Sequence, residues 1–354
     1  MGVYTGWGKI GVLALLLCFL TECTFTTPRT IAVRTTVELQ RALADARPGQ
    51  TIVLADGLYV GKFVTNKRGT AAQPITLQGS PAAILAGESL SNGYVFHLKE
   101  AAYWILTGFT LRHAAKGIML DHANNNRLDH LLIEQIGQEA VHFRTCSTDN
   151  TIQYSTIRNT GVITPGFGEG VYIGTDIAKW TIYGCDSKEA RDQSDANQIL
   201  YNHFGPDIRA EAIDVKEGTK GGIIIGNIFD ATGLSGENFA DSWLDIKGND
   251  YKVTHNRGVQ NKSSHLRHGF ETHNKIPNWG RHNLFCANVL HLKSSGYGFH
   301  IDTTDPYHGN IVCDNNAVSG AELGLSNIPV TNSALPMNLL KQELPALVEL
   351  PYGD

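Results

Sequence analysis

Short segments of alternating apolar and polar residues recur between residue 117 and about residue 327. Most of them begin with Gly or Ala and continue as apolar, polar, apolar, polar. They cover residues 117–121, 140–144, 170–174, 212–216, 243–247, 269–273, 298–302 and 324–326. Because successive side chains of a strand point to opposite faces, each segment predicts a short strand with one face in a core.

A second kind of segment recurs between these strands and ends in an asparagine. The asparagines are Asn202, Asn227, Asn256, Asn288 and Asn315, which are 25, 29, 32 and 27 residues apart. A period of this size, with two or three short strands and no helical pattern, is typical of one turn of a parallel β-helix. We therefore expect an all-β solenoid in which the asparagines stack at a bend and tolerate a left-handed backbone.

Both ends of a solenoid expose its core and need a cap. Thr35 and Glu38 have the spacing of a capping box, and apolar residues follow at helical spacing until Pro48. This pattern predicts a short amphipathic N-terminal capping helix over the first turn. Residues 26–328 are expected to form a single domain, and residues 329–354 a tail that packs on it.

The N-terminal segment has the features of a secretory signal. Lys9 precedes an apolar run from Ile10 to Leu20, which is too short for a membrane span and suits the apolar part of a signal peptide. Residues 1–25 are therefore predicted to be a signal peptide and the protein to be secreted. Cys23 loosely resembles a lipoprotein cleavage site, but Glu22 before it is atypical, so a lipid anchor is the less favoured interpretation.

Four cysteines follow this segment, and an even number suits an oxidising compartment. Cys286 and Cys313 fall in the same column of successive turns, where they are close enough for a disulfide or for a stack of thiols. Cys146 and Cys185 could close the insertion at residues 184–195. Four buried free thiols remain the alternative.

The formal net charge of −5 is mild. It does not indicate nucleic acid or an anionic membrane as a partner. The 37 glycines agree with a fold that has many tight turns. Nothing in the sequence predicts a membrane span after the signal or a second domain, and we expect a monomer.

The polar positions of the predicted strands form columns on the outer face, because neighbouring turns lie about 4.8 Å apart. The first column contains Met119, His142, Tyr172, Asp214, Asp245, Glu271 and His300. The second contains Asp121, Arg144, Gly174, Lys216, Lys247, His273 and Asp302. A third, at the bend before each strand, contains Lys116, Glu139, Glu169, Glu211, Ser242, His268 and Tyr297. One face therefore gathers acids, lysines and histidines.

Two like-charged pairs stand out in these columns. Asp214 is expected beside Asp245, and Lys216 beside Lys247, on neighbouring turns. Like charges directly opposite each other are destabilising unless a cation or an anionic ligand lies between them. A functional site is expected where local rules conflict in this way. A ladder of surface ion pairs is the alternative interpretation.

The chain resembles a known enzyme family at these positions. The stretch from Ala46 to Tyr59 looks like the start of the β-helical polysaccharide lyases of the alginate lyase and chondroitinase B group. Glu211 precedes Lys216 by five residues, as a calcium-binding Glu precedes the catalytic Lys in that group. One turn later, Lys247 stands where the group has a catalytic arginine. The resemblance implies a right-handed parallel β-helix like that of the pectate lyases.

The resemblance also implies a chemistry, which is β-elimination from a uronic acid unit. Lys216 would remove the proton at C5, with its pKa lowered by Lys247 and a metal. Lys247 would stabilise developing charge or help the leaving group. Glu211 would hold Ca²⁺ or another cation, with Glu169 and Asp214 as weaker candidates.

The remaining column residues are candidates for binding an acidic polysaccharide. Arg144 and His273 are candidates for uronate carboxylates, and His142, Tyr172 and His300 for contacting or protonating the sugar. Asp245 and Glu271 complete the predicted substrate-binding set. Another glycan-active enzyme, either a hydrolase or a uronate epimerase, and a non-catalytic glycan-binding or structural β-helix are the alternatives.

Overall fold

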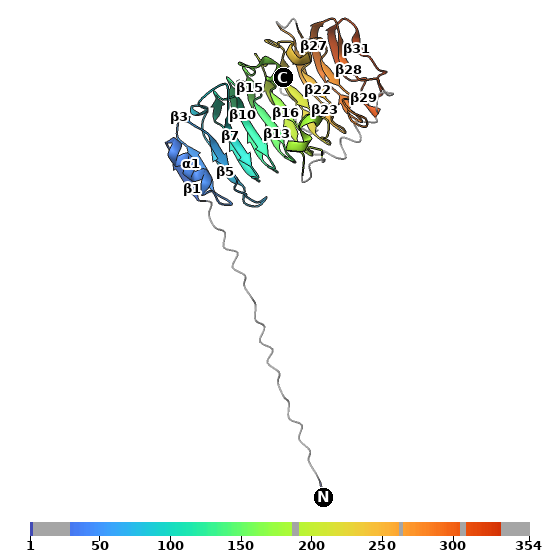
Figure 1. The fold of residues 1–354 in the computed structure, drawn as a ribbon. Coiled ribbons are helices and arrows are strands. Elements are labelled where there is room, and N and C mark those ends of the chain that lie inside the picture. The colour runs from blue at the N-terminus through green and yellow to red at the C-terminus, as the bar shows by residue number, and fades with distance from the viewer. Residues whose placement is uncertain (3–28, 186–190, 262–264, 305–308, 334–354) are drawn as a thin grey trace, which may run out of the picture.

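The computed structural model describes residues 1–2, 29–185, 191–261, 265–304 and 309–333. Three parallel sheets wind around one axis to form a parallel β-helix, as predicted (Figure 1). No described helix is long and apolar enough to cross a membrane. Nearly all of the predicted signal peptide, Cys23 and most of the 329–354 tail lie outside the described residues.

Successive turns of the coil add strands to the same three sheets. One sheet contains β1 (Thr30–Val33), β2 (Thr51–Leu54), β5 (Ile75–Gln78), β8 (Trp104–Thr107), β11 (Arg127–Asp129), β14 (Thr151–Gln153), β17 (Gln198–Leu200), β20 (Ile223–Ile225), β23 (Lys252–Thr254), β26 (Leu284–Cys286) and β29 (Ile311–Val312). Another contains β3 (Gly57–Val60), β6 (Ala83–Ala86), β9 (Thr110–Arg112), β12 (Leu132–Glu134), β15 (Thr156–Arg158), β18 (His203–Phe204), β21 (Ile228–Asp230), β24 (Arg257–Val259), β27 (Val289–Ser294) and β30 (Ala317–Ala321).

The third sheet carries the predicted polar columns and is called the groove sheet. It contains β4 (Phe63–Thr65), β7 (Tyr94–Lys99), β10 (Lys116–Asp121), β13 (Val141–Arg144), β16 (Val171–Ile173), β19 (Ile213–Val215), β22 (Leu244–Ile246), β25 (Phe270–Thr272), β28 (Tyr297–Ile301) and β31 (Gly324–Ser326). The eight predicted segments correspond, in order, to β10, β13, β16, β19, β22, β25, β28 and β31 of this sheet. The pattern missed β4 and β7, which begin with Phe63 and Tyr94 in place of a small residue.

The interior of the coil is filled by the apolar residues of the alternating pattern. Phe204 stacks on Phe229, with ring centroids 5.3 Å apart, and Phe229 meets Phe270 edge to face at 5.6 Å. Phe270 meets Phe299 at 5.7 Å in the same way. Such aromatic pairs contribute about 0.5–1.5 kcal/mol each beyond the burial of their surface. The turns therefore stack through a continuous apolar column that holds the groove sheet in register.

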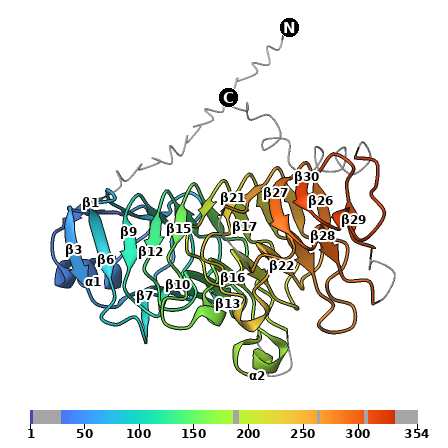
Figure 2. The ribbon, with the colours of Figure 1, turned by 90° about the horizontal axis from the view of Figure 1, so that it is seen from above.

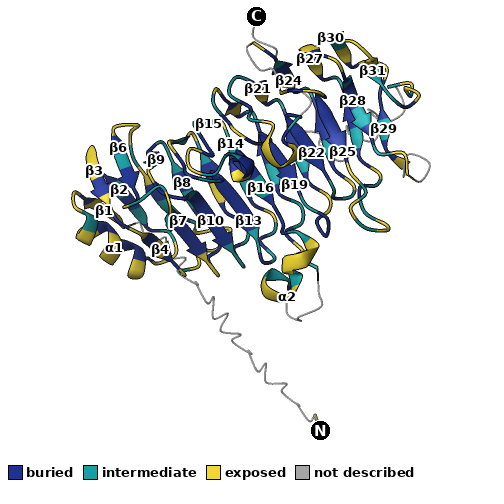
Figure 3. Cartoon of the chain, turned by 45° about the horizontal axis from the view of Figure 1, so that its top comes forward, coloured by how far each residue is buried: buried dark blue, intermediate teal, exposed yellow. Residues whose placement is uncertain are grey.

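The predicted capping helix is α1 (Thr36–Ala44), and it packs on β1 and β4. The Glu38 backbone N–H donates to the Thr35 hydroxyl at 3.2 Å, and the Thr35 backbone N–H donates to the Glu38 carboxylate at 3.2 Å. Leu39 and Leu43 are fully buried against the first turn, while the other side of α1 is exposed (Figure 3). The capping box thus starts the helix, and its apolar face closes the N-terminal end of the core.

An asparagine ladder joins the turns, with one correction to the prediction. The side-chain amide of Asn288 donates to Asn316 at 3.0 Å, so the last member is Asn316 and not Asn315. The left-handed backbone also lies elsewhere, at the residue before each of the first four asparagines. These residues are Tyr201, Gly226, His255 and Ala287. Because they make the bend, each of these four asparagine side chains is buried and bonds to the next turn.

Two disulfides join the four described cysteines, Cys146 to Cys185 and Cys286 to Cys313. The alternative of free thiols is therefore wrong. The Cys146–Cys185 bond ties down an insertion after β16 that contains the 3₁₀ turn η2 (Ile177–Lys179) and α2 (Trp180–Tyr183). Figure 2 shows α2 standing out from the coil beside β13 and β16.

Candidate active site

A groove of about 1090 Å³ runs along the outer face of the groove sheet. All twelve residues predicted for the site line it. They are Glu169, Glu211 and Asp214 for the metal, Lys216 and Lys247 for catalysis, and His142, Arg144, Tyr172, Asp245, Glu271, His273 and His300 for substrate binding. The repeat therefore brings together residues that are up to 158 positions apart in the sequence.

Strand pairing accounts for this assembly. Tyr172 pairs with Asp214, Asp214 with Asp245, Asp245 with Glu271, and Glu271 with His300, so the first predicted column is confirmed. The prediction that these positions face solvent is wrong for most of them. Asp214 and Glu271 are only 3 % exposed.

Ion pairs within each strand and one diagonal ion pair between turns separate the two like-charged pairs. Lys216 Nζ lies 2.6 Å from Asp214 Oδ2, and Lys247 Nζ lies 2.9 Å from Asp214 Oδ1 on the neighbouring turn. Lys247 also contacts Asp245 on its own strand. Each carboxylate therefore meets an ammonium rather than the other carboxylate.

These contacts also decide the charge of the lysines. Burial lowers the pKa of Lys216, but the Asp214 carboxylate outweighs it and holds this pKa well above its usual range. The same balance, with Asp214 and Asp245 as the anions, raises the pKa of Lys247. In this arrangement the pKa of Lys216 is therefore raised and not lowered as predicted, because Asp214 outweighs the repulsion between the two lysines. Both side chains are ammonium groups at neutral pH.

Three buried acids lie beside the lysines. One carboxylate oxygen each from Glu169, Glu211 and Asp214 lies within 4.8 Å of the others. Burial, followed by the charges of Glu139 and Asp214, raises the pKa of Glu169 to about 8. Burial and Asp214 also raise the pKa of Glu211 well above its usual range. Such a cluster of hard oxygen donors, costly to ionise without a counter-charge, fits Ca²⁺ or Mg²⁺.

His273 forms a cationic position at the next turns. Its Nδ1 lies 2.7 Å from Asp245 Oδ1, and its Nε2 lies 3.5 Å from Glu271 Oε2. The charge of Asp245 raises the pKa of His273 to about 9. At neutral pH the imidazole is therefore charged, and its partly exposed ring can meet a uronate carboxylate in the groove.

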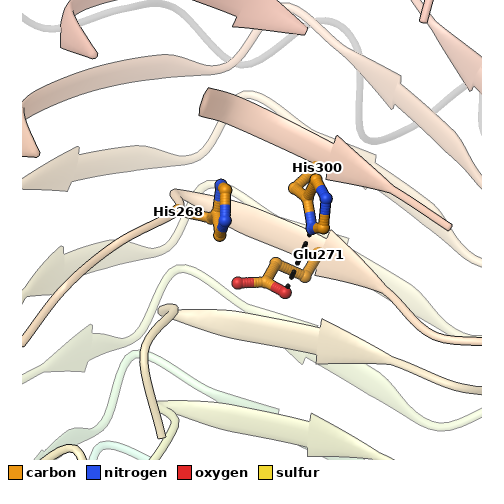
Figure 4. A group of neighbouring side chains, drawn as sticks. All are labelled: His268, Glu271 and His300. Atoms are coloured by element: carbon orange, nitrogen blue, oxygen red, sulfur yellow. Dashed lines mark ion pairs between the residues drawn. The ribbon is translucent and has the colours of Figure 1, made fainter. Parts of the chain in front are cut away.

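The groove continues into a cluster of His268, Glu271 and His300, shown in Figure 4. The two imidazole rings stack 4.2 Å apart. His268 Nδ1 accepts the Tyr297 backbone N–H at 3.0 Å, so the neutral ring carries its proton on Nε2. Burial lowers the pKa of His268 to about 4, which keeps it neutral. Nδ1 then accepts a hydrogen bond and Nε2 carries the proton, so neither nitrogen offers a lone pair to a metal. His268 is therefore a hydrogen-bond donor rather than a metal ligand.

Glu271 joins the two histidines of this cluster. His300 Nδ1 lies 3.5 Å from Glu271 Oε2, as the dashed line in Figure 4 shows, and Glu271 Oε1 is buried without a hydrogen-bond partner among the described residues. The His268 donor and the Glu271 carboxylate acceptor at the floor of a groove suit the hydroxyl groups of a sugar. Sequence reasoning placed His268 in the bend column but gave it no role, because its position precedes the alternating pattern.

At the end of the groove away from His268 and His300, two residues predicted to bind substrate already have partners within the protein. Arg144 makes two hydrogen bonds to Asp121, at 2.6 and 3.1 Å, and its guanidinium lies over the Tyr183 ring at 4.0 Å. His142 contacts Glu139 at 3.0 Å through one ring nitrogen and the Gly174 carbonyl at 2.9 Å through the other. Both side chains line the groove, and their role in binding substrate stays a prediction.

Tyr172 connects this end to the lysine and carboxylate cluster. Its ring lies edge-on to His142, with centroids 4.5 Å apart, and Lys216 Nζ lies 5.0 Å from its centre. Burial and the nearby Asp214 raise its pKa well above the usual range. Tyr172 is therefore a neutral phenol that can donate a proton or a hydrogen bond to a sugar.

Known structures resemble this chain to different degrees. The alginate lyase from Paenibacillus sp. str. FPU-7 is 39 % identical, with a TM-score of 0.74 over 86 % of this chain and 97 % of that one. A PL6 family polysaccharide lyase from Pseudopedobacter saltans is 15 % identical, with a TM-score of 0.52 over 81 % of this chain and 77 % of that one.

A GH136 lacto-N-biosidase from Eubacterium ramulus is 12 % identical, with a TM-score of 0.56 over 83 % of this chain and 62 % of that one. This similarity and that to the PL6 lyase show the fold alone. No protein-family model matches the sequence, and a search of curated proteins also gives no match.

Proposed function

The chain belongs to the family of β-helical polysaccharide lyases that includes the alginate lyase it resembles, and we propose that it cleaves a uronic-acid polysaccharide by β-elimination in the groove described above. The observation that carries this proposal is the meeting of Lys216, Lys247 and three buried carboxylates on adjoining turns. Alginate is the first candidate substrate, because it is the substrate named for a relative of 39 % identity.

The reaction breaks a C5–H bond and the bond between C4 and the glycosidic oxygen. A base takes the C5 proton, the electron pair forms a C4–C5 double bond, and the leaving oxygen gains a proton. The C5 proton is weakly acidic while the neighbouring carboxylate is charged, so positive charge beside that carboxylate lowers the barrier. The groove supplies such charge through Lys247 and His273.

The three acids are proposed to hold a divalent cation. Glu169, Glu211 and Asp214 fit it through their clustered, buried carboxylate oxygens. When bound, Ca²⁺ would neutralise the substrate carboxylate and stabilise enediolate-like charge.

Asp214 then has two competing roles, since it also pairs with Lys216. Burial is the largest influence on Lys216, and it favours the neutral amine. When Asp214 serves the carboxylate cluster, Lys216 loses its nearest counter-charge, and burial then favours the neutral amine that acts as the base. Lys247 stays an ammonium through Asp245 and supports the developing charge, while the Tyr172 phenol is placed to give a proton to the leaving oxygen.

The two disulfides support a secreted enzyme, because such bonds persist in oxidising compartments. The reaction class is tested by incubating the purified protein with alginate, pectate, glucuronan and chondroitin in the presence of Ca²⁺. A lyase generates an unsaturated uronide that absorbs in the ultraviolet, a hydrolase generates only reducing ends, and a binding protein generates neither. Reducing ends without absorbance would reject the proposal.

A further inference from the structure

One wall of the groove is an aromatic lip, defined here as Phe167 and Phe239. Phe239 is 91 % exposed and Phe167 is 55 % exposed, and both line the groove. They belong to two 3₁₀ turns, η1 (Pro165–Phe167) and η3 (Glu237–Phe239), which contact each other. Exposed apolar side chains that gather at one place mark binding surfaces.

The backbone that positions this aromatic lip is conformationally strained. Phe239 has φ +66° and Asn238 has φ +55°, a left-handed conformation that is unfavourable for a bulky residue such as Phe. The Asn238 side-chain amide donates to the Gly166 carbonyl at 3.0 Å, so the two turns are fastened together. Gly166 permits this approach, since a Cβ there would lie 3.0 Å from the Asn238 Cβ. This strained backbone places the Phe239 ring in solvent, where the ring does not stabilise the core.

The lip faces the proposed catalytic cluster. Phe167 precedes β16 and Phe239 precedes β22, and β19, which leads into Lys216, lies between these strands in the groove sheet. Strands that are two positions apart are separated by roughly 10 Å. The lip therefore brackets the turn that carries Asp214 and Lys216.

The opposite wall is polar. Asp176 and Lys179 of the disulfide-bound insertion line it, together with Lys275 after β25. Lys275 Nζ lies 3.3 Å from Asp176 Oδ2, so an ion pair joins the two segments. A sugar ring of a polyuronate has the same asymmetry, with an apolar C–H face and a carboxylate edge.

Resting on the function proposed above, we propose that the aromatic lip is a substrate-binding element on which polyuronate sugars stack their apolar face, with the carboxylate edge turned to the lysines. Phe239 contributes affinity beside the scissile bond, and Phe167 extends the platform by one sugar. The lip thereby fixes which edge of each sugar faces the charged floor.

The test compares Phe239→Ala, Phe239→Gly and Phe239→Tyr with the native protein. Loss of the ring should raise KM for alginate by about two- to ten-fold with a smaller change in kcat, the size expected for one aromatic contact. Phe239→Tyr should behave like the native protein. Phe239→Gly should unfold at the same or a higher temperature, because Gly adopts positive φ without strain. Leu323→Ala removes another exposed apolar side chain (55 %) that does not line the groove, and it is the control.

Electrophoresis through gels containing alginate separates this proposal from the proposed reaction. Retardation of the native protein and of Leu323→Ala, lost in Phe239→Ala and Phe239→Gly, supports the lip even if no unsaturated product forms. Equal retardation and equal KM of native protein and Phe239→Ala would overturn it, while cleavage itself would still stand. A native protein that neither cleaves nor is retarded by alginate, pectate, glucuronan or chondroitin would reject both proposals.

Discussion

Lys247 Nζ lies 2.9 Å from Asp214 Oδ1 on the preceding turn and also contacts Asp245 on its own strand. A single ammonium thus serves two buried carboxylates. Lys216 occupies the same column and pairs with Asp214 alone among these two acids. The two lysines occupy equivalent positions in the repeat, but we therefore expect Lys247 to contribute more to the stability of the fold than Lys216.

Substituting the lysines by Met should reveal this difference. Lys247→Met leaves Asp214 and Asp245 facing each other with one counter-charge fewer, and removing a partner of a buried ion pair typically costs about 3–5 kcal/mol. In Lys216→Met, Asp214 keeps Lys247, so we expect a loss of less than about 2 kcal/mol. Urea unfolding measures both. Equal losses in the two variants would show that Lys247 does not bridge the turns.

Calcium should stabilise the folded protein through the acid cluster. A ligand that binds only the folded state at 100 times its Kd adds about 2.7 kcal/mol. We expect Ca²⁺ to raise the unfolding temperature of the native protein, and Glu211→Gln to remove most of this shift. Glu88→Gln changes an exposed acid elsewhere and should keep it. The same shift in Glu211→Gln and native protein would place the cation elsewhere.

His273 should make stability depend on pH. Its pKa rises from 6.5 to about 9 on folding, chiefly because of Asp245. The folded state therefore holds a proton that the unfolded state loses above pH 6.5, so this contribution is complete below that pH and disappears as pH rises to about 9. His273→Asn should flatten the stability profile across this range, whereas His282→Asn, at an exposed histidine paired with Asp250, should not. An unchanged slope in His273→Asn would contradict the assignment.

Removing the two disulfides one at a time should affect stability in one case and activity in the other. Replacing Cys286 and Cys313 by Ser should lower the free energy of unfolding by roughly 2–4 kcal/mol, since this bond joins successive turns of the coil. Replacing Cys146 and Cys185 frees the insertion that forms one wall of the groove, so activity should fall more than stability. Each double variant is the control for the other. Comparable activity in both would show that the insertion needs no tether.

The alternating pattern predicted which residues share the groove, because parallel pairing with a constant repeat aligns equivalent positions on every turn. It could not predict how side chains cross between turns. The diagonal contact of Lys247 with Asp214 depends on rotamers. So does the contact of Lys216 with Asp214, which reverses the expected sign of the Lys216 pKa shift. Strand pairing thus fixes the location of a charge but not its partner.

Irregular positions limited the prediction further. In the sequence Asp314-Asn315-Asn316, two asparagines compete for one ladder position, and only the bend decides between them. His268 lies at a bend, outside the alternation. Phe239 follows Gly236 and Asn238, which are residue types that often adopt a left-handed backbone, but a Phe gives no sign of doing so itself.

Ultraviolet absorbance on alginate with Ca²⁺ tests the central claim most directly, with native protein and Lys216→Met measured side by side. The account predicts that native protein produces unsaturated uronide and that Lys216→Met, still folded by its urea transition, loses at least about a hundred-fold in rate, as expected for a general base. An Lys216→Met variant that retains the native rate would contradict it.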